Sequence, residues 1–243
     1  MAKTVARPET VETVTTTETA VQNNFWDKYS KPIIYVGSAF IIAVGAWFGY
    51  KEFIQKPKET KANEMIFAAE NLFDKMATAG FSKDSSVVVL NGGTLGEQNI
   101  TGVLKVASEY GGTGAGNRAR YIAGATYLHL KEFDKAISHL MEFDANGATQ
   151  VESKAYLMLG HAYAEQNKTG EALDAYKKAA NANKKDEGIT ADALLMAASY
   201  AEATGKADEA KKLFNELKGN FPLHNSVRSG EVDKYLARLG ELK

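Results

Sequence analysis

The stretch YLMLGHAY, residues 156–163, sets the pattern from which the fold of this chain can be inferred. Large side chains recur along it at helical spacing, with Gly160 between them, and Ala172 and Tyr176 follow in a second stretch of the same kind. Small residues let two antiparallel helices touch, while aromatic residues fill the groove between one helix pair and the next. The two stretches therefore predict a helical hairpin.

The same pattern occurs once before and once after this hairpin. The earlier copy has Ala123, Gly124, Tyr127, Ala136 and Leu140, and the later copy has Leu194, Ala197, Ala198, Ala201, Ala210, Phe214 and Pro222. The equivalent residues Ala136, Ala172 and Ala210 are 36 (172 − 136) and 38 (210 − 172) positions apart. This pattern resembles the tetratricopeptide repeat, whose usual length is about 34 residues. The resemblance predicts three repeats over residues 117–225, with slightly longer loops between them.

Stacked hairpins need a cover at both ends, because each hairpin alone leaves an apolar face exposed. Residues 52–116 are expected to form connecting helices and the N-terminal cap, and residues 226–243 a C-terminal capping helix. Within the N-terminal cap, the apolar run at residues 87–90 predicts an extended loop or a short strand, and residues 99–110 predict a short helix. The predicted fold class is all-α, a tetratricopeptide α-solenoid behind one transmembrane helix.

The transmembrane helix is predicted from PIIYVGSAFIIAVGAWFGY, residues 32–50, which contains no charged side chain. A helix of that length spans roughly 28 Å, close to the roughly 30 Å hydrocarbon core of a bilayer. Trp26 and Tyr29 before it and Trp47 and Tyr50 at its end fit the two membrane interfaces. A cleaved signal peptide or a buried core helix are the alternatives. We expect an uncleaved anchor, with an interfacial segment and membrane helix over residues 25–51 and a disordered tail over residues 1–24.

Small residues recur inside the predicted span. Gly45 and Gly49 form a G-x-x-x-G pair, and Ala39 and Ala43 stand at the same spacing. Such residues allow two helix backbones to approach closely in a membrane. They predict a packing face for the membrane helix of a partner, or they are ordinary small residues that face lipid.

Composition and motifs argue against several function classes. The chain has no cysteine, which removes thiol chemistry and disulfides, and its net charge of −1 is unlike that of a nucleic-acid binder. The four histidines, His129, His139, His161 and His224, do not pair at metal-ligand spacing. The glycine-rich run at residues 111–118 lacks the context of a phosphate-binding loop. We expect no catalytic residue, metal, cofactor or small-molecule substrate.

A concave groove is the predicted binding site, because the first helix of each hairpin lines such a groove at positions not used for stacking. The predicted groove residues are Arg118, Tyr121, Leu128, Lys154, Leu157, His161, Leu195 and Ser199. Their mixture of basic, aromatic and aliphatic side chains suits an extended or helical peptide. The paired Lys and Asn pattern that holds a C-terminal carboxylate in chaperone-binding repeats is missing.

The layout and the segment EYGGTGAGNRARYIAG, residues 109–124, resemble the YfgM-like family of bacterial membrane-anchored tetratricopeptide proteins. The resemblance implies an accessory subunit of the Sec translocon in the bacterial inner membrane, with a cytoplasmic N-terminus and a periplasmic repeat domain that binds emerging proteins or chaperones. A scaffold for cell-envelope synthesis, division or outer-membrane assembly is the alternative. Lys51, Lys56, Lys58 and Lys61 after the span outnumber Lys28 and Lys31 before it, which favours the opposite orientation.

Overall fold

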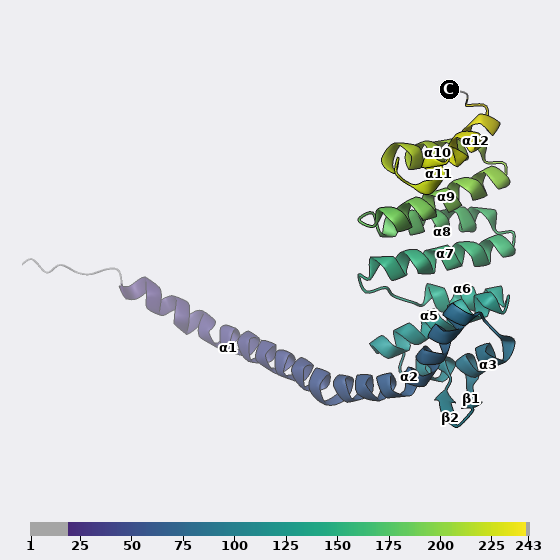
Figure 1. Ribbon diagram of the computed structural model, residues 1–243. Coiled ribbons are helices and arrows are strands. Elements are labelled where there is room, and N and C mark those ends of the chain that lie inside the picture. Colours follow the sequence, from purple (N-terminus) through teal and green to yellow (C-terminus); the bar gives the residue numbers. More distant parts are fainter. Residues whose placement is uncertain (1–18, 242–243) are drawn as a thin grey trace, which may run out of the picture. The chain divides into compact units, whose positions relative to one another are not determined.

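The computed structural model describes residues 19–241, with side chains from residue 29 onward (Figure 1). The chain splits into two compact units, residues 1–55 and residues 56–243. The first unit contains α1 (Thr19–Tyr50) and a π-helical segment, η1 (Lys51–Gln55). The second unit begins with α2 (Lys56–Ala79), α3 (Lys83–Asn91), β1 (Gly92–Leu95), β2 (Gln98–Thr101) and α4 (Val103–Glu109). It continues with α5 (Gly114–His129), α6 (Phe133–Met141), α7 (Thr149–Glu165), α8 (Thr169–Ala182), α9 (Glu187–Ala203), α10 (Ala207–Asn220), α11 (Asn225–Arg228) and α12 (Glu231–Arg238). The predicted all-α class with repeat hairpins is confirmed.

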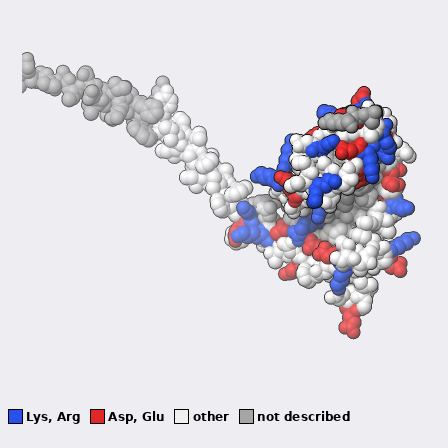
Figure 2. Space-filling view, turned by 45° about the horizontal axis from the view of Figure 1, so that its top comes forward, with Lys and Arg blue, Asp and Glu red and all other residues white. Residues whose placement is uncertain are grey.

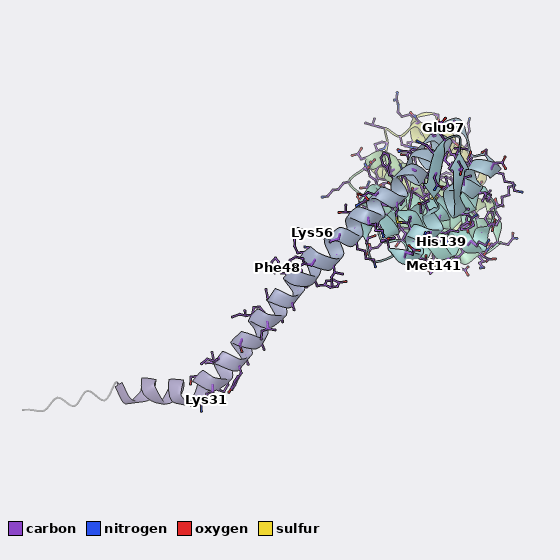
Figure 3. All side chains as sticks on the ribbon, turned by 90° about the horizontal axis from the view of Figure 1, so that it is seen from below. Lys31, Phe48, Lys56, Glu97, His139 and Met141 are labelled. Carbon is purple, nitrogen blue, oxygen red and sulfur yellow. The ribbon has the colours of Figure 1, made fainter. Side chains whose placement is uncertain are left out.

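Helix α1 is the one helix among the described residues that is long and apolar enough to span a membrane. Its large apolar side chains, including Ile34, Val36 and Phe40, are exposed, and Figure 3 shows side chains standing out from it between Lys31 and Phe48. A core helix would bury such residues, so α1 fits a single-pass anchor or a signal sequence. The helix begins at Thr19, so the predicted disordered tail is wrong for residues 19–24, and residues 1–18 lie outside the described part.

Three helical hairpins form the main body of the second unit: α5 with α6, α7 with α8, and α9 with α10. Each hairpin turns through one left-handed residue, at Lys131, Asn167 and Gly205, and these positions are 36 (167 − 131) and 38 (205 − 167) residues apart. The following N–H groups donate to the carbonyl oxygens of Tyr127, Tyr163 and Ala201 over 2.9, 2.9 and 2.8 Å. The turns therefore reproduce the register that the sequence predicts.

Close helix contacts in the first two hairpins depend on glycine. A Cβ atom added at Gly124 would lie 2.5 Å from Cγ of Leu140, and one added at Gly160 would overlap the ring of Tyr176. Leu140 and Tyr176 come from α6 and α8, the second helices of their hairpins. A larger residue at either glycine would push the two helices apart.

The hydrophobic core of the second unit consists of two large clusters of buried residues and a small one between them. One cluster joins α2 through α6 and includes Ala162 of α7, and a second joins α8 through α12. A small third cluster, which we call the bridging cluster, consists of Leu140, Ala155, Leu159 and Ala175 and lies where the first hairpin meets the second.

The N-terminal cap differs from its prediction in detail. Residues 87–90 lie within α3, because Ser82 caps that helix and its Oγ accepts the N–H of Ser85 over 3.1 Å. The predicted loop or strand is therefore wrong. The strands lie directly after α3, where β1 pairs antiparallel with β2 and Gly93 lies opposite Ile100. Residues 99–101 belong to β2, so the predicted helix over 99–110 begins only at Val103.

The C-terminal cap consists of two helices. A left-handed Gly230, with φ of 73°, separates α11 from α12, so the predicted single helix over residues 226–243 is interrupted. Val232 and Leu236 are buried against the C-terminal core cluster. Arg238 pairs with Glu202 of α9 at 2.8 Å. The C-terminal cap therefore covers the third hairpin, while residues 242–243 lie outside the described part.

Candidate functional site

The first helices of the hairpins lie side by side, and α2 extends their row. Helix α5 packs beside α7, α7 beside α9, and α2 beside α5, while α4 packs against α5 as α6 packs against α7 (Figure 1). Helices α2 and α4 therefore occupy the places of a further hairpin, with α3 and the strands inserted between them. The row of first helices therefore begins at α2, one helix earlier than the sequence predicts.

A cavity of about 440 Å³ opens between α2, α5 and the segment that leads into α7. We call it the α2–α5 pocket. Its apolar lining comes from Phe67, Phe73, Tyr121, Phe143 and Val151. Phe67 is 65% exposed, and the ring centroids of Tyr121 and Phe143 are 5.3 Å apart at 56°. An exposed aromatic residue beside a tilted aromatic pair is the kind of surface that receives an apolar side chain of a partner.

Hydrogen bonds of charged and amide side chains fix the rim of the pocket. Nε of Arg118 donates to Glu70 over 2.7 Å, and Nη2 donates to Asn63 over 2.8 Å. Oδ1 of Asn117 accepts the N–H of Asp144 over 2.9 Å and fixes the loop that carries Phe143. The Arg118–Glu70 pair is partly exposed, so it contributes little stability and its guanidinium is available to a competing carboxylate.

The glycine-rich N-terminus of α5 is occupied by a side chain of the protein itself. Glu59 accepts the N–H of Gly114 over 2.8 Å and that of Ala115 over 3.1 Å. Oγ1 of Thr113 accepts the N–H of Gly116 over 3.0 Å. These bonds satisfy N–H donors at the positive end of the helix from within the chain itself.

The eight predicted groove residues do not share one cavity. Arg118 and Tyr121 line the α2–α5 pocket. Leu128 packs against the N-terminal core cluster, and Leu157 and Leu195 pack against the C-terminal one. Lys154 is exposed, Ser199 is half-buried, and His161 is held by Tyr176.

The contribution of α2 to the pocket was not predicted from the sequence. Phe67 and Phe73 stand on a helix that was predicted only as a cap. Phe67 lies next to buried Ile66 yet is exposed, so it departs from the amphipathic pattern of its helix. An aromatic residue on the polar face of a helix was the signal that could have identified it.

His161 has a structural partner. Its Nδ1 lies 3.0 Å from the hydroxyl of Tyr176, whose side chain is almost fully buried. Burial raises the pKa of Tyr176 to about 12 and lowers the pKa of His161. The pair joins α7 to α8 inside the second hairpin.

One series of side-chain contacts has the residue types of a hydrolase triad, running from Ser226 through His224 to Asp192. Nδ1 of His224 lies 2.8 Å from Ser226 Oγ, and Nε2 lies 3.0 Å from Asp192. Ser226 is only 4% exposed, so its hydroxyl cannot reach a substrate while α11 is folded. These contacts link α9 to α11. Among residues 19–241, no group of three His, Cys, Asp or Glu side chains could hold a metal ion.

Comparison with protein-family models identifies two segments as tetratricopeptide repeats, residues 153–186 and residues 192–224. They correspond to the second and third hairpins. A comparison with curated proteins found no match. The chain therefore contains tetratricopeptide repeats, a module typical of non-catalytic proteins that bind other proteins. The first hairpin has the same left-handed turn and the same kind of contact between its two helices.

Proposed function

We propose that this protein is a non-catalytic, membrane-anchored adaptor that binds protein segments in the α2–α5 pocket and its adjoining repeat groove. The observation that carries the proposal is the aromatic lining of this pocket at the end of the row of repeat helices. On the face shown in Figure 2, basic and acidic side chains are interspersed over the second unit, which fits protein partners better than nucleic acid.

The pocket suits an apolar side chain within an extended or helical peptide. Phe67 and Tyr121 offer aromatic surface, and Arg118 stands at the rim to meet a carboxylate of the bound segment. Loss of one buried aromatic contact typically weakens binding by more than about 1 kcal/mol. Lys154, Leu157, His161, Leu195 and Ser199 extend the proposed groove along α7 and α9, and Leu128 lies at the far end of α5.

The anchor of this adaptor is α1. We place the N-terminus in the cytoplasm and the repeats in the periplasm of a bacterial cell, which the family resemblance supports and the flanking lysines oppose. Such an anchor keeps the groove near proteins that leave a membrane channel. We therefore infer that subunits of the Sec translocon are partners in the inner membrane, and that emerging proteins or periplasmic chaperones occupy the groove.

A membrane partner would pack on the small residues of α1. Apart from neighbouring residues and the backbone of the helix itself, no described atom lies within 4 Å of a Cβ atom added at Gly45 or Gly49, so this face is open. Ala39 and Ala43 have the same four-residue spacing but lie about 120° around the helix from the glycine pair, so they offer a second packing face.

Affinity purification from mild-detergent extracts tests the proposal. The wild-type protein should bring down translocon subunits and soluble clients, and Phe67→Ala with Tyr121→Ala should lose the soluble clients alone. Leu95→Ala with Leu223→Ala is the matched control, because both are exposed apolar residues that belong neither to the pocket nor to the proposed groove. Recovery of only envelope-synthesis or division proteins would replace the translocon assignment by the scaffold alternative. Equal recovery of clients with both double variants would contradict the pocket as the binding site.

A further inference from the structure

Helix α6 is shorter than its counterparts in the other two hairpins. It has 9 residues, whereas α8 and α10 have 14 each. The chain leaves the helix after Met141 and turns through Asn146 and Gly147, which both have left-handed φ. Oδ1 of Asp144 accepts the N–H of Asn146 over 2.8 Å and fixes this turn. The second helix of the first hairpin is thus five residues (14 − 9) shorter than the second helices of the other two hairpins.

A cavity of about 450 Å³ lies beside the end of α6 and is lined by residues of α6, of the loop that follows it, of α7 and of α8. We call it the α6–α8 cavity. Its floor is the bridging cluster, and Tyr156 and Tyr163 of α7 add aromatic walls. Met141, 66% exposed, stands at its edge and appears at the periphery of the second unit in Figure 3. The cavity therefore exposes apolar surface that a further helical turn would cover.

The charges around this cavity are strongly unbalanced. Its acidic lining residues are Asp144, Glu152, Glu171 and Asp174. Within the described part of the chain, Lys178 is the one cationic residue that lines it, and its ammonium group lies 5.8 Å from the ring centroid of Tyr156. The local sum is −3 (1 − 4), although the whole chain carries only −1. Clustered carboxylates beside an apolar floor attract a cation that is attached to an apolar segment.

We propose that the α6–α8 cavity is a second binding site, which takes a basic amphipathic segment of a partner protein. An apolar side chain of that segment packs on Leu159 and Ala175, and its Lys or Arg residues meet Glu171 and Asp174. The site is separate from the α2–α5 pocket, since the two share only Phe143, Asp144 and Ala145. Its existence does not depend on the proposed translocon role.

Binding of designed peptides tests this site. The probes are two fluorescent helical peptides with the same leucine face, one with lysine and one with glutamate on the other face. The full chain is held in phosphatidylcholine nanodiscs, and empty nanodiscs provide the blank. The lysine peptide should bind at least about tenfold more tightly than the glutamate peptide, with an affinity that falls as salt increases. Equal binding of both peptides, or no binding of the lysine peptide, would overturn the proposal.

Charge variants locate the binding. Glu171→Lys with Asp174→Lys should weaken binding of the lysine peptide by about tenfold or more, and the neutral pair Glu171→Gln with Asp174→Asn by less. Glu109→Lys with Glu216→Lys makes the same charge change on exposed positions outside the cavity and should leave most of the affinity. Thermal melts check that each variant is folded.

Two further results distinguish this site from the first. Phe67→Ala should leave the affinity for the lysine peptide unchanged, since Phe67 neither lines the α6–α8 cavity nor packs against the bridging cluster. An equal loss of affinity in the Glu171/Asp174 and Glu109/Glu216 lysine variants would assign the binding to net charge and refute the site. Unchanged affinity in the Glu171/Asp174 variants would refute it as well.

Discussion

Glu59 Oε2 accepts the backbone N–H of Gly114 over 2.8 Å, although the two residues are 55 positions apart. This bond fixes the N-terminus of α5 on α2, and α2 supplies Phe67 to the α2–α5 pocket. The geometry of the pocket thus depends on a helix cap that is built from a distant carboxylate.

Glu59→Ala should lower the stability of the N-terminal part of the repeat domain by about 1 kcal/mol, because it leaves the N–H groups of Gly114 and Ala115 without their acceptor. Glu59→Gln keeps an acceptor and should lose less. Hydrogen exchange of the first turn of α5, together with thermal melts, measures both effects. Unchanged protection of that turn in Glu59→Ala would contradict the capping role.

Gly160→Ala should destabilise the second hairpin by about 1 to 3 kcal/mol, because the new methyl group overlaps the ring of Tyr176. Gly219→Ala is the matched control. It makes the same change inside α10 where no atom lies within 4 Å, and it should stabilise the protein by roughly 0.5 to 1 kcal/mol. Urea unfolding separates the two outcomes. An unchanged or raised midpoint for Gly160→Ala would show that α7 and α8 are not packed as described.

The stability of the repeat domain should fall as the pH is lowered through about 6.5, the ordinary pKa of histidine. Burial lowers the pKa of His129, His139 and His161 in the folded state, so the unfolded chain binds more protons in that range. Their contribution is fully present above the unfolded pKa and is lost below it. His161→Asn can keep a hydrogen bond to Tyr176 and should reduce the difference between urea midpoints at about pH 7.5 and about pH 5.5. An unchanged difference between the two midpoints would show that His161 does not contribute to this pH dependence.

Gly45→Leu with Gly49→Leu should weaken association with a membrane partner, since the added side chains separate backbones that must nearly touch. The repeat domain should melt as in the wild type. Ile34→Leu with Val36→Leu is the control, because it changes exposed apolar residues of α1 without adding bulk to the glycine face. Co-purification of the partner at wild-type levels with the glycine variant would mean that this face is not used.

The repeats could be predicted from the sequence because each hairpin has a small residue that packs against a large one of its second helix, as Gly160 packs against Tyr176. Such pairs recur at nearly constant spacing along the chain. The sequence predicts residues 87–90 badly, because a four-residue apolar run has no period that distinguishes helix from strand, and the hydrogen bond at Ser82 decides the outcome. The α2–α5 pocket could be predicted only in part. Arg118 and Tyr121 follow from the repeat register, whereas Phe67 enters through contacts between α2 and α5, such as the Arg118–Glu70 pair, that no local pattern reveals.

Photo-crosslinking in intact cells tests whether the α2–α5 pocket holds protein partners. A benzophenone amino acid is placed at Phe67 in one variant and at Leu223, which is 80% exposed and does not line the pocket, in another. Position 67 should give discrete protein adducts that disappear when Tyr121→Ala is added, and position 223 should give only background. The same adducts from both positions, or none from position 67, would contradict binding in the pocket.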